Sequence, residues 1–130
     1  MSTQDDVRRI ALSLPATTED PNHFRFLVEG KAFAWSWLER VDPKRPRIEN
    51  PEVIAVRVAG EIEKESLIET DPAIFFTEPH YDGYRAVLVH LAAIEVERLE
   101  PILVDAWRSR APRRLVRDDE RATGTEEQPG

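Results

Sequence analysis

Two short apolar runs separated by a polar, aromatic turn constrain the fold of this chain more than any other feature. Ile74–Thr77 and Val87–Val89 are rich in β-branched and aromatic residues, which predicts two strands with a buried face. Pro79 and Gly83 lie between them and favour a loop, because proline lacks a backbone donor and glycine tolerates positive φ. We expect the strands to pair and the loop to present four side chains near the sheet end: His80, Tyr81, Asp82 and Tyr84.

His80 and Asp82 are two residues apart in this loop, and their spacing allows two interpretations. They are candidates for an acid–base pair or for ligand contacts. Asp and aromatic side chains also order turns without any further role, and this structural interpretation is favoured.

Length and composition predict one domain. The chain has 130 residues, and we assign 1–117 to the domain and 118–130 to an acidic, disordered tail. The absence of cysteine excludes disulfides and thiolate sites and favours a cytoplasmic location. No apolar run approaches the roughly 20 residues that span a bilayer, so no membrane partner is expected. The net charge of −7 disfavours a general polyanion-binding surface.

An aromatic hairpin is predicted around Glu29–Gly30, which is typical of a two-residue turn. Counting outward from the turn pairs Phe26 with Phe33 and Phe24 with Trp35. Five aromatic residues would then share the buried face: Phe24, Phe26, Phe33, Trp35 and Trp37. The opposite, open face would hold His23, Arg25, Ala32, Ala34 and Ser36.

Periodicity and proline positions predict the remaining elements. These are an amphipathic helix capped by Ser2 or Thr3 and ended by Pro15, a polar linker at 17–21, a strand at 53–58, a helix at 61–71 anchored by Ile62, Leu67 and Ile68, and a helix at 94–111. Pro101 predicts that the last helix starts near it or kinks there. Strand alternation adds Arg57 and His90 to the open face.

Basic residues gather in two places. Residues 39–51 contain three prolines and predict an exposed loop with a basic tip of Lys44, Arg45 and Arg47. The second group runs from the end of the last helix to residue 117 without an intervening acid and contains Arg108, Arg110, Arg113, Arg114 and Arg117.

Three segments of this sequence, Gly30–Ala34, Phe75–Tyr84 and Ala106–Leu115, resemble the MmcQ/YjbR-like proteins. The resemblance runs from about Asp5 to Val116. It implies a CyaY-like α/β fold of the α+β type, in which an antiparallel sheet packs against N- and C-terminal helices. It also implies a DNA-binding role, without established catalytic residues. Arg85 stands where relatives often have proline, which adds a basic side chain beside the loop.

Two functions from different classes follow. The first is DNA binding, in which the C-terminal arginines contact phosphates, joined by the basic loop if the two converge. The alternative role for these arginines is to stabilise a helix C-terminus and pair with carboxylates. The second function is a small-ligand or protein-interaction module that uses the open face. There the side chains of His23, Arg25, Arg57 and His90 would project and receive an anionic ligand, a peptide or a partner subunit.

No enzyme, cofactor or metal site is expected. The sequence has no phosphate-binding glycine loop and no nucleophile with an identifiable base. A hard-cation site needs clustered carboxylates, and the first helix supplies only Asp5 and Asp6. A pair formed by His23 and His90 would require two strands of unknown order to be neighbours.

Overall fold

A six-stranded antiparallel sheet forms the centre of the computed structural model, which describes residues 1–39 and 42–118. Its strand order is β1-β2-β3-β4-β6-β5. The strands are β1 (Thr17–Glu19), β2 (Arg25–Val28), β3 (Lys31–Glu39), β4 (Ile48–Arg57), β5 (Phe75–Phe76) and β6 (Ala86–His90). The two runs that opened the sequence analysis are β5 and β6, and they pair as expected, with Phe75 opposite Val89.

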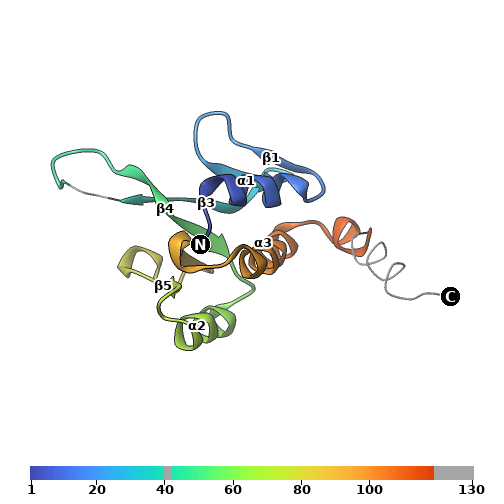
Figure 1. Cartoon of the computed structure of the whole chain (residues 1–130). Coiled ribbons are helices and arrows are strands. Elements are labelled where there is room, and N and C mark those ends of the chain that lie inside the picture. The colour runs from blue at the N-terminus through green and yellow to red at the C-terminus, as the bar shows by residue number, and fades with distance from the viewer. Residues whose placement is uncertain (40–41, 119–130) are drawn as a thin grey trace.

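Helices from both ends of the chain cover one face of this sheet (Figure 1). The helices are α1 (Gln4–Ser13), α2 (Glu61–Thr70) and α3 (Val96–Arg110), with short 3-10 turns η1 (Pro79–Tyr81) and η2 (Leu91–Ala93) and a last helical stretch at 113–118. Val7 and Ile10 of α1 pack with Leu99, Leu103 and Trp107 of α3 in the main core. The predicted α+β class, an antiparallel sheet packed against N- and C-terminal helices, is therefore confirmed.

The turn between β2 and β3 forms as predicted, but the register beyond it does not. Glu29 and Gly30 both have positive φ, 46° and 81°, as a tight hairpin turn requires. A β-bulge then leaves Phe33 as an extra residue, so Phe26 pairs with Ala34 instead of Phe33. Arg25 accordingly lies opposite Trp35, the position that the regular register gave to Phe24.

This bulge redistributes the aromatic residues between the two faces. Phe24, Phe26 and Phe33 lie in the main core beneath the helices. Trp35 and Trp37 pack against the second, smaller cluster on the opposite face, so the prediction that all five aromatics share one face is wrong. Ala34 and Ser36, which were assigned to the open face, are buried on the other side of the sheet.

Four further expectations are corrected. The predicted polar linker contains edge strand β1 (Thr17–Glu19), which pairs antiparallel with the otherwise unpaired edge of β2. Strand β4 begins at Ile48, inside the predicted proline-rich loop, and forms with the end of β3 an arm that projects from the domain (Figure 1). The part of that loop at 40–41 lies outside the described residues. Ile62 is 81% exposed and does not anchor α2. Helix α3 begins at Val96 and contains Pro101, so the alternative in which the helix starts at that proline is wrong.

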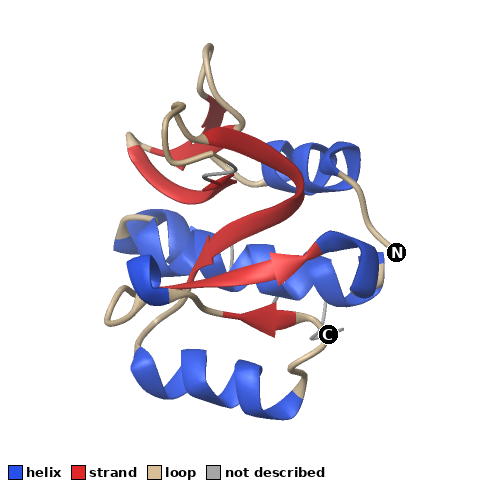
Figure 2. Ribbon diagram, turned by 90° about the vertical axis from the view of Figure 1, so that its left-hand side faces the viewer, coloured by secondary structure: helices blue, strands red, loops and turns tan. Residues whose placement is uncertain are grey.

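Helix α2 lies along the β5 side of the sheet (Figure 2). Its hydrophobic contacts come from Leu67 and Ile68, which are partly buried against the core. Lys64 is its most buried residue, with an exposed fraction of 3%. The predicted tail lies outside the described residues from residue 119 onward, while Leu115 and Val116 still pack against the core.

Candidate anion-binding site on the open sheet face

A single row of paired residues crosses five strands on the sheet face opposite α1 and α3. Arg25 pairs with Trp35, Trp35 with Ala55, Ala55 with Leu88, and Leu88 with Phe76. Ala55 and Leu88 are fully buried and form the floor of the row. Because paired residues share a face, the row carries a cation at one end and aromatic rings along its length.

The loop between β5 and β6 packs over this floor and is held there by Lys64. The Lys64 Nζ donates to the carbonyl oxygens of Tyr81 at 2.6 Å and Tyr84 at 2.9 Å. Gly83, between them, has a φ of 77° that favours glycine. The lysine on α2 therefore fixes the backbone that presents two tyrosine rings to the open face.

Three aromatic rings pack edge to face above the floor. The ring centroids of Trp35 and Tyr84 lie 6.3 Å apart, and those of Tyr81 and Tyr84 lie 6.0 Å apart. The Trp35 Nε1 donates to the Tyr81 hydroxyl oxygen at 3.2 Å. Burial raises the pKa of Tyr81 above its usual value, which keeps the phenol protonated. Among the described residues its hydrogen has no acceptor, so it can donate to a ligand.

Three arginines from three elements meet at one hollow beside these rings. The hollow has a volume of about 180 Å³ and is lined by Arg25, Ala32, Trp35, Arg57, Tyr84 and Arg110. Arg57, near the end of β4, lies over the Tyr84 ring with its Cζ 5.3 Å from the centroid. Arg110 is the last residue of α3. No acidic side chain lines the hollow among the residues that the structure describes.

Two of these guanidinium groups have buried donors without a partner. The Nε atoms of Arg57 and Arg110 are inaccessible to solvent and make no hydrogen bond within residues 1–39 and 42–118. Buried polar atoms are nearly always hydrogen-bonded in folded proteins, so two such donors beside one hollow indicate a place for an acceptor. An anion in the hollow would supply it after a small movement of the two side chains, because neither Nε atom is open to solvent in this structure.

The third guanidinium already has a carboxylate partner. The Arg25 Nη2 lies 2.7 Å from the Asp20 Oδ2. The backbone N–H of Asn22, helped by the Arg25 side chain, lowers the pKa of Asp20 below its usual value. Asp20 consequently stays charged and orients Arg25, while Arg57 and Arg110 form no ion pair within residues 1–39 and 42–118.

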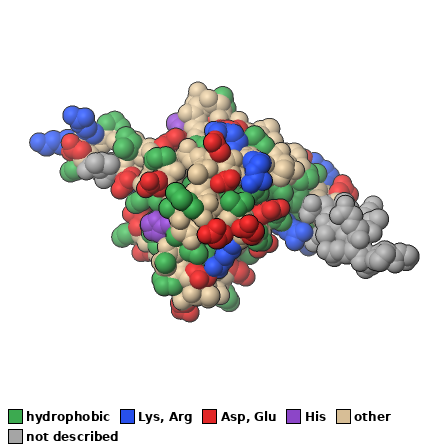
Figure 3. Space-filling view, viewed as in Figure 1, with side chains coloured by type: hydrophobic (Ala, Val, Ile, Leu, Met, Phe, Trp, Pro, Cys, Tyr) green, Lys and Arg blue, Asp and Glu red, His purple; other side chains and the backbone are tan. Residues whose placement is uncertain are grey.

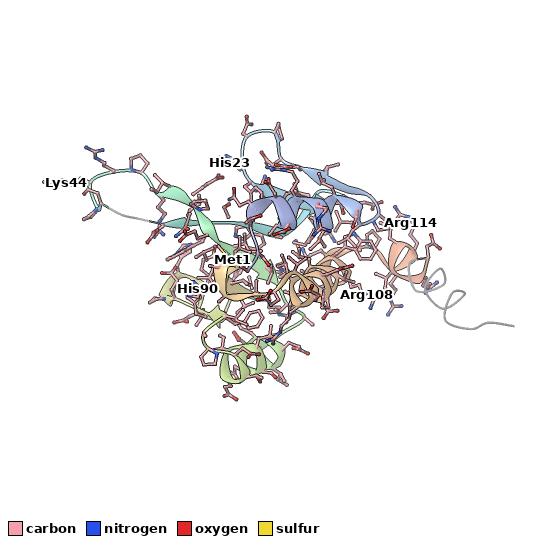
Figure 4. All side chains as sticks on the ribbon, in the orientation of Figure 1. Met1, His23, Lys44, His90, Arg108 and Arg114 are labelled. Atoms are coloured by element: carbon pink, nitrogen blue, oxygen red, sulfur yellow. The ribbon has the colours of Figure 1, made fainter. Side chains whose placement is uncertain are left out.

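The open-face and loop candidates from the sequence are only partly brought together. Arg25 and Arg57 line the arginine hollow, and His80 lines a second hollow next to it. The His23 Nδ1 lies 3.4 Å from the Glu49 Oε1. Figure 4 shows that His23 and His90 lie apart. His90 stacks on Phe76, and Asp82 is exposed with no ion pair to His80 among the described residues.

The basic loop and the C-terminal arginines do not converge. Figure 4 shows Lys44 at the tip of the β3–β4 arm and Arg114 at the opposite end of the molecule. Arg114 pairs with Glu29, Arg45 lies 3.7 Å from Asp42, and Arg47 donates to the Leu38 carbonyl. Of the C-terminal arginines, Arg110 alone lines the hollow; Arg113 and Arg117 are exposed on the helical stretch 113–118, and Arg108 lines a different cavity.

Charge on the visible surface is mixed. In Figure 3 acidic and basic side chains alternate over the helix-covered face, and a basic group marks the tip of the arm. Within residues 1–39 and 42–118, no three His, Asp or Glu side chains form a group that could hold a metal ion. Every helix in these ranges is too short or too polar to cross a bilayer.

Sequence reasoning missed the part that four residues play in this site. It placed Trp35 in the main core, because the bulge at Phe33 has no sequence signal in a regular alternation. It named Tyr81 and Tyr84 as loop residues without linking them to the arginines. It gave Lys64 no role, although a basic residue at the centre of an otherwise acidic helix was a usable signal.

Comparison with known proteins identifies the family. The YjbR family model matches residues 12–109 of this chain. The chain belongs to the YjbR family. Its curated relatives include Rv2570 of Mycobacterium tuberculosis and Mb2600 of Mycobacterium bovis, both described as uncharacterized, each 43% identical over 122 residues that cover 89% of this chain and 94% of the relative.

A solved structure supports the fold. The crystal structure of Deinococcus radiodurans protein DR2400, with a DUF419 domain, superposes with a TM-score of 0.60. It shares 20% sequence identity, and the match covers 82% of this chain and 77% of that one. The resemblance to the MmcQ/YjbR-like proteins is thus confirmed at the level of family and fold.

Proposed function

We propose that this YjbR-family protein is a non-enzymatic binding module that takes an anionic ligand on its open sheet face. One observation carries the proposal: Arg25, Arg57 and Arg110, which are distant in sequence, meet at one hollow with two buried, unpartnered Nε donors. This is the second of the two functions that the sequence suggested, with Arg110 added from the C-terminal arginines.

The chemistry of guanidinium favours phosphate, sulfate or carboxylate as the bound group. Arginine donates in a planar fork that matches two oxygens of such an anion. Charge-assisted hydrogen bonds contribute about 1.5–3 kcal/mol each, more than neutral ones, and the partly buried setting reduces competition from water. The aromatic walls limit solvent access to Arg57, whose guanidinium lies over Tyr84.

Titration with inorganic phosphate, followed by calorimetry, tests the proposal. We expect saturable binding to the intact chain, and an affinity at least about tenfold lower for the double variant Arg57→Gln/Arg110→Gln, because each lost contact is worth more than about 1.4 kcal/mol. The matched control is Arg113→Gln/Arg117→Gln, which removes the same charge from exposed positions. An equal loss in both double variants would show a general charge effect and overturn the site.

Duplex DNA binding through the C-terminal arginines is the second candidate function. It is favoured by the exposure of Arg113 and Arg117 on the helical stretch 113–118. It is opposed by the net charge of −7 and by the separation of the two basic groups in Figure 4. A protein that contacts few phosphates forms a weak, strongly salt-dependent complex.

For duplex DNA we therefore expect no saturable binding at near-physiological salt. Fluorescence anisotropy of a labelled duplex at low and near-physiological salt is the measurement, with Arg113, Arg114 and Arg117, which do not line the hollow, changed together to Ala as the control. Saturable binding that survives physiological salt and is weakened by the triple change would make DNA binding the better proposal.

A further inference from the structure

A second hollow with a different lining adjoins the arginine hollow. The second has a volume of about 240 Å³ and is lined by Trp35, His80, Tyr81 and Tyr84. Trp35 and Tyr84 line both hollows and form the boundary between them. Each hollow alone is smaller than the roughly 300 Å³ of a typical small-ligand site, so a ligand of that size would extend over both.

From this juxtaposition we infer that the ligand carries a flat aromatic ring beside its anionic group, as a nucleoside monophosphate or an aryl phosphate does. The inference rests on the proposed function, since the arginine hollow must hold the anion. The ring would occupy the hollow whose four lining side chains are all aromatic. Aromatic rings bind other rings through stacked or edge-to-face contacts.

The charge around the aromatic hollow selects against a cationic ligand. Aromatic hollows also bind quaternary ammonium groups, whose charge is attracted to ring faces. Here Arg57 already lies over the Tyr84 ring, at 5.3 Å from the centroid. The guanidiniums of Arg25 and Arg110 line the adjoining hollow, and no carboxylate lines either one within the described residues. A second cation would be repelled, whereas a neutral ring would not.

One polar group in the aromatic hollow suits a ring with heteroatoms. The Tyr81 hydroxyl accepts from Trp35 at 3.2 Å and keeps its own hydrogen for another acceptor. A ring nitrogen or carbonyl oxygen of a nucleobase is such an acceptor. The loop that carries Tyr81 is fixed through Lys64, so the donor is held in place before a ligand arrives.

A set of matched phosphates tests this inference by calorimetry on the full chain. Methyl phosphate and phenyl phosphate carry the same charge and differ in the ring, and adenosine 5′-monophosphate adds ring heteroatoms. We expect phenyl phosphate to bind about 5- to 100-fold more tightly than methyl phosphate, as one base–aromatic contact typically provides. Adenosine without phosphate should bind far more weakly than its monophosphate.

Variants separate the two hollows. His80→Ala changes an exposed residue that lines only the aromatic hollow, and Tyr81→Phe removes only the hydroxyl. We expect His80→Ala to lower the affinity for phenyl phosphate and Tyr81→Phe to lower that for adenosine monophosphate, with methyl phosphate binding unchanged. Equal affinities for methyl and phenyl phosphate would overturn the ring inference and leave the anion site standing. Absence of binding by all the phosphates would overturn both.

Discussion

Replacing Trp107 by alanine is expected to lower the free energy of unfolding by about 3–5 kcal/mol, the usual cost of truncating a large buried aromatic residue. Trp107 is fully buried in the main core between α1 and α3. Its Nε1 donates to the Pro15 carbonyl at 3.0 Å, across the end of α1. The substitution would both open a cavity and leave that carbonyl without its donor. Urea denaturation followed by circular dichroism measures the change.

The control is Trp107→Phe, which keeps most of the volume and loses only the indole donor. We expect it to cost about 1–3 kcal/mol, because the Pro15 carbonyl loses its indole donor and a smaller cavity remains. If the alanine variant were no less stable than the phenylalanine variant, Trp107 would not join the two terminal helices as the structure indicates.

Lys64→Met is expected to lower the free energy of unfolding by about 2–3 kcal/mol. Methionine keeps the length of the side chain but donates nothing, so the Tyr81 and Tyr84 carbonyls lose the Nζ that binds both. Because these carbonyls belong to the loop that lines the site, phosphate and phenyl phosphate affinity should fall as well. Denaturation and calorimetry on the same variant measure the two effects.

A matched control separates a local effect from a general loss of charge. Lys44→Met makes the same chemical change on the exposed tip of the β3–β4 arm, and we expect it to alter neither stability nor affinity by more than experimental error. Equal stability of the Lys64 and Lys44 variants would contradict the role assigned to Lys64.

The fold was predictable because its main signals are local. The apolar spacing of 7, 10 and 11 defines α1, and Glu29–Gly30 defines the first hairpin. What could not be predicted is the bulge at Phe33, since it depends on how two strands twist and pack over the core. One extra residue moved Trp35 and Trp37 to the opposite face of the sheet. Trp35, which was predicted to lie in the main core, therefore lines the candidate site.

The candidate site was predictable in part for the same reason. The alternation along β2 and β4 is unaffected by a bulge on β3, so Arg25 and Arg57 lie on the predicted face. The role of Arg110 depends on where α3 ends relative to the sheet, which no sequence pattern specifies. The contact of Lys64 with the loop carbonyls is likewise a product of tertiary packing.

Nuclear magnetic resonance of the arginine Nε–Hε groups during a phosphate titration tests the anion site most directly. Signals would be assigned with single Arg→Lys variants at 57, 110, 113 and 117. We predict that the Nε–Hε signals of Arg57 and Arg110 shift together and saturate, because these two buried donors gain an acceptor. Shifts confined to the exposed Arg113 and Arg117, or no saturable shift at Arg57 and Arg110, would contradict an anion site on the open sheet face.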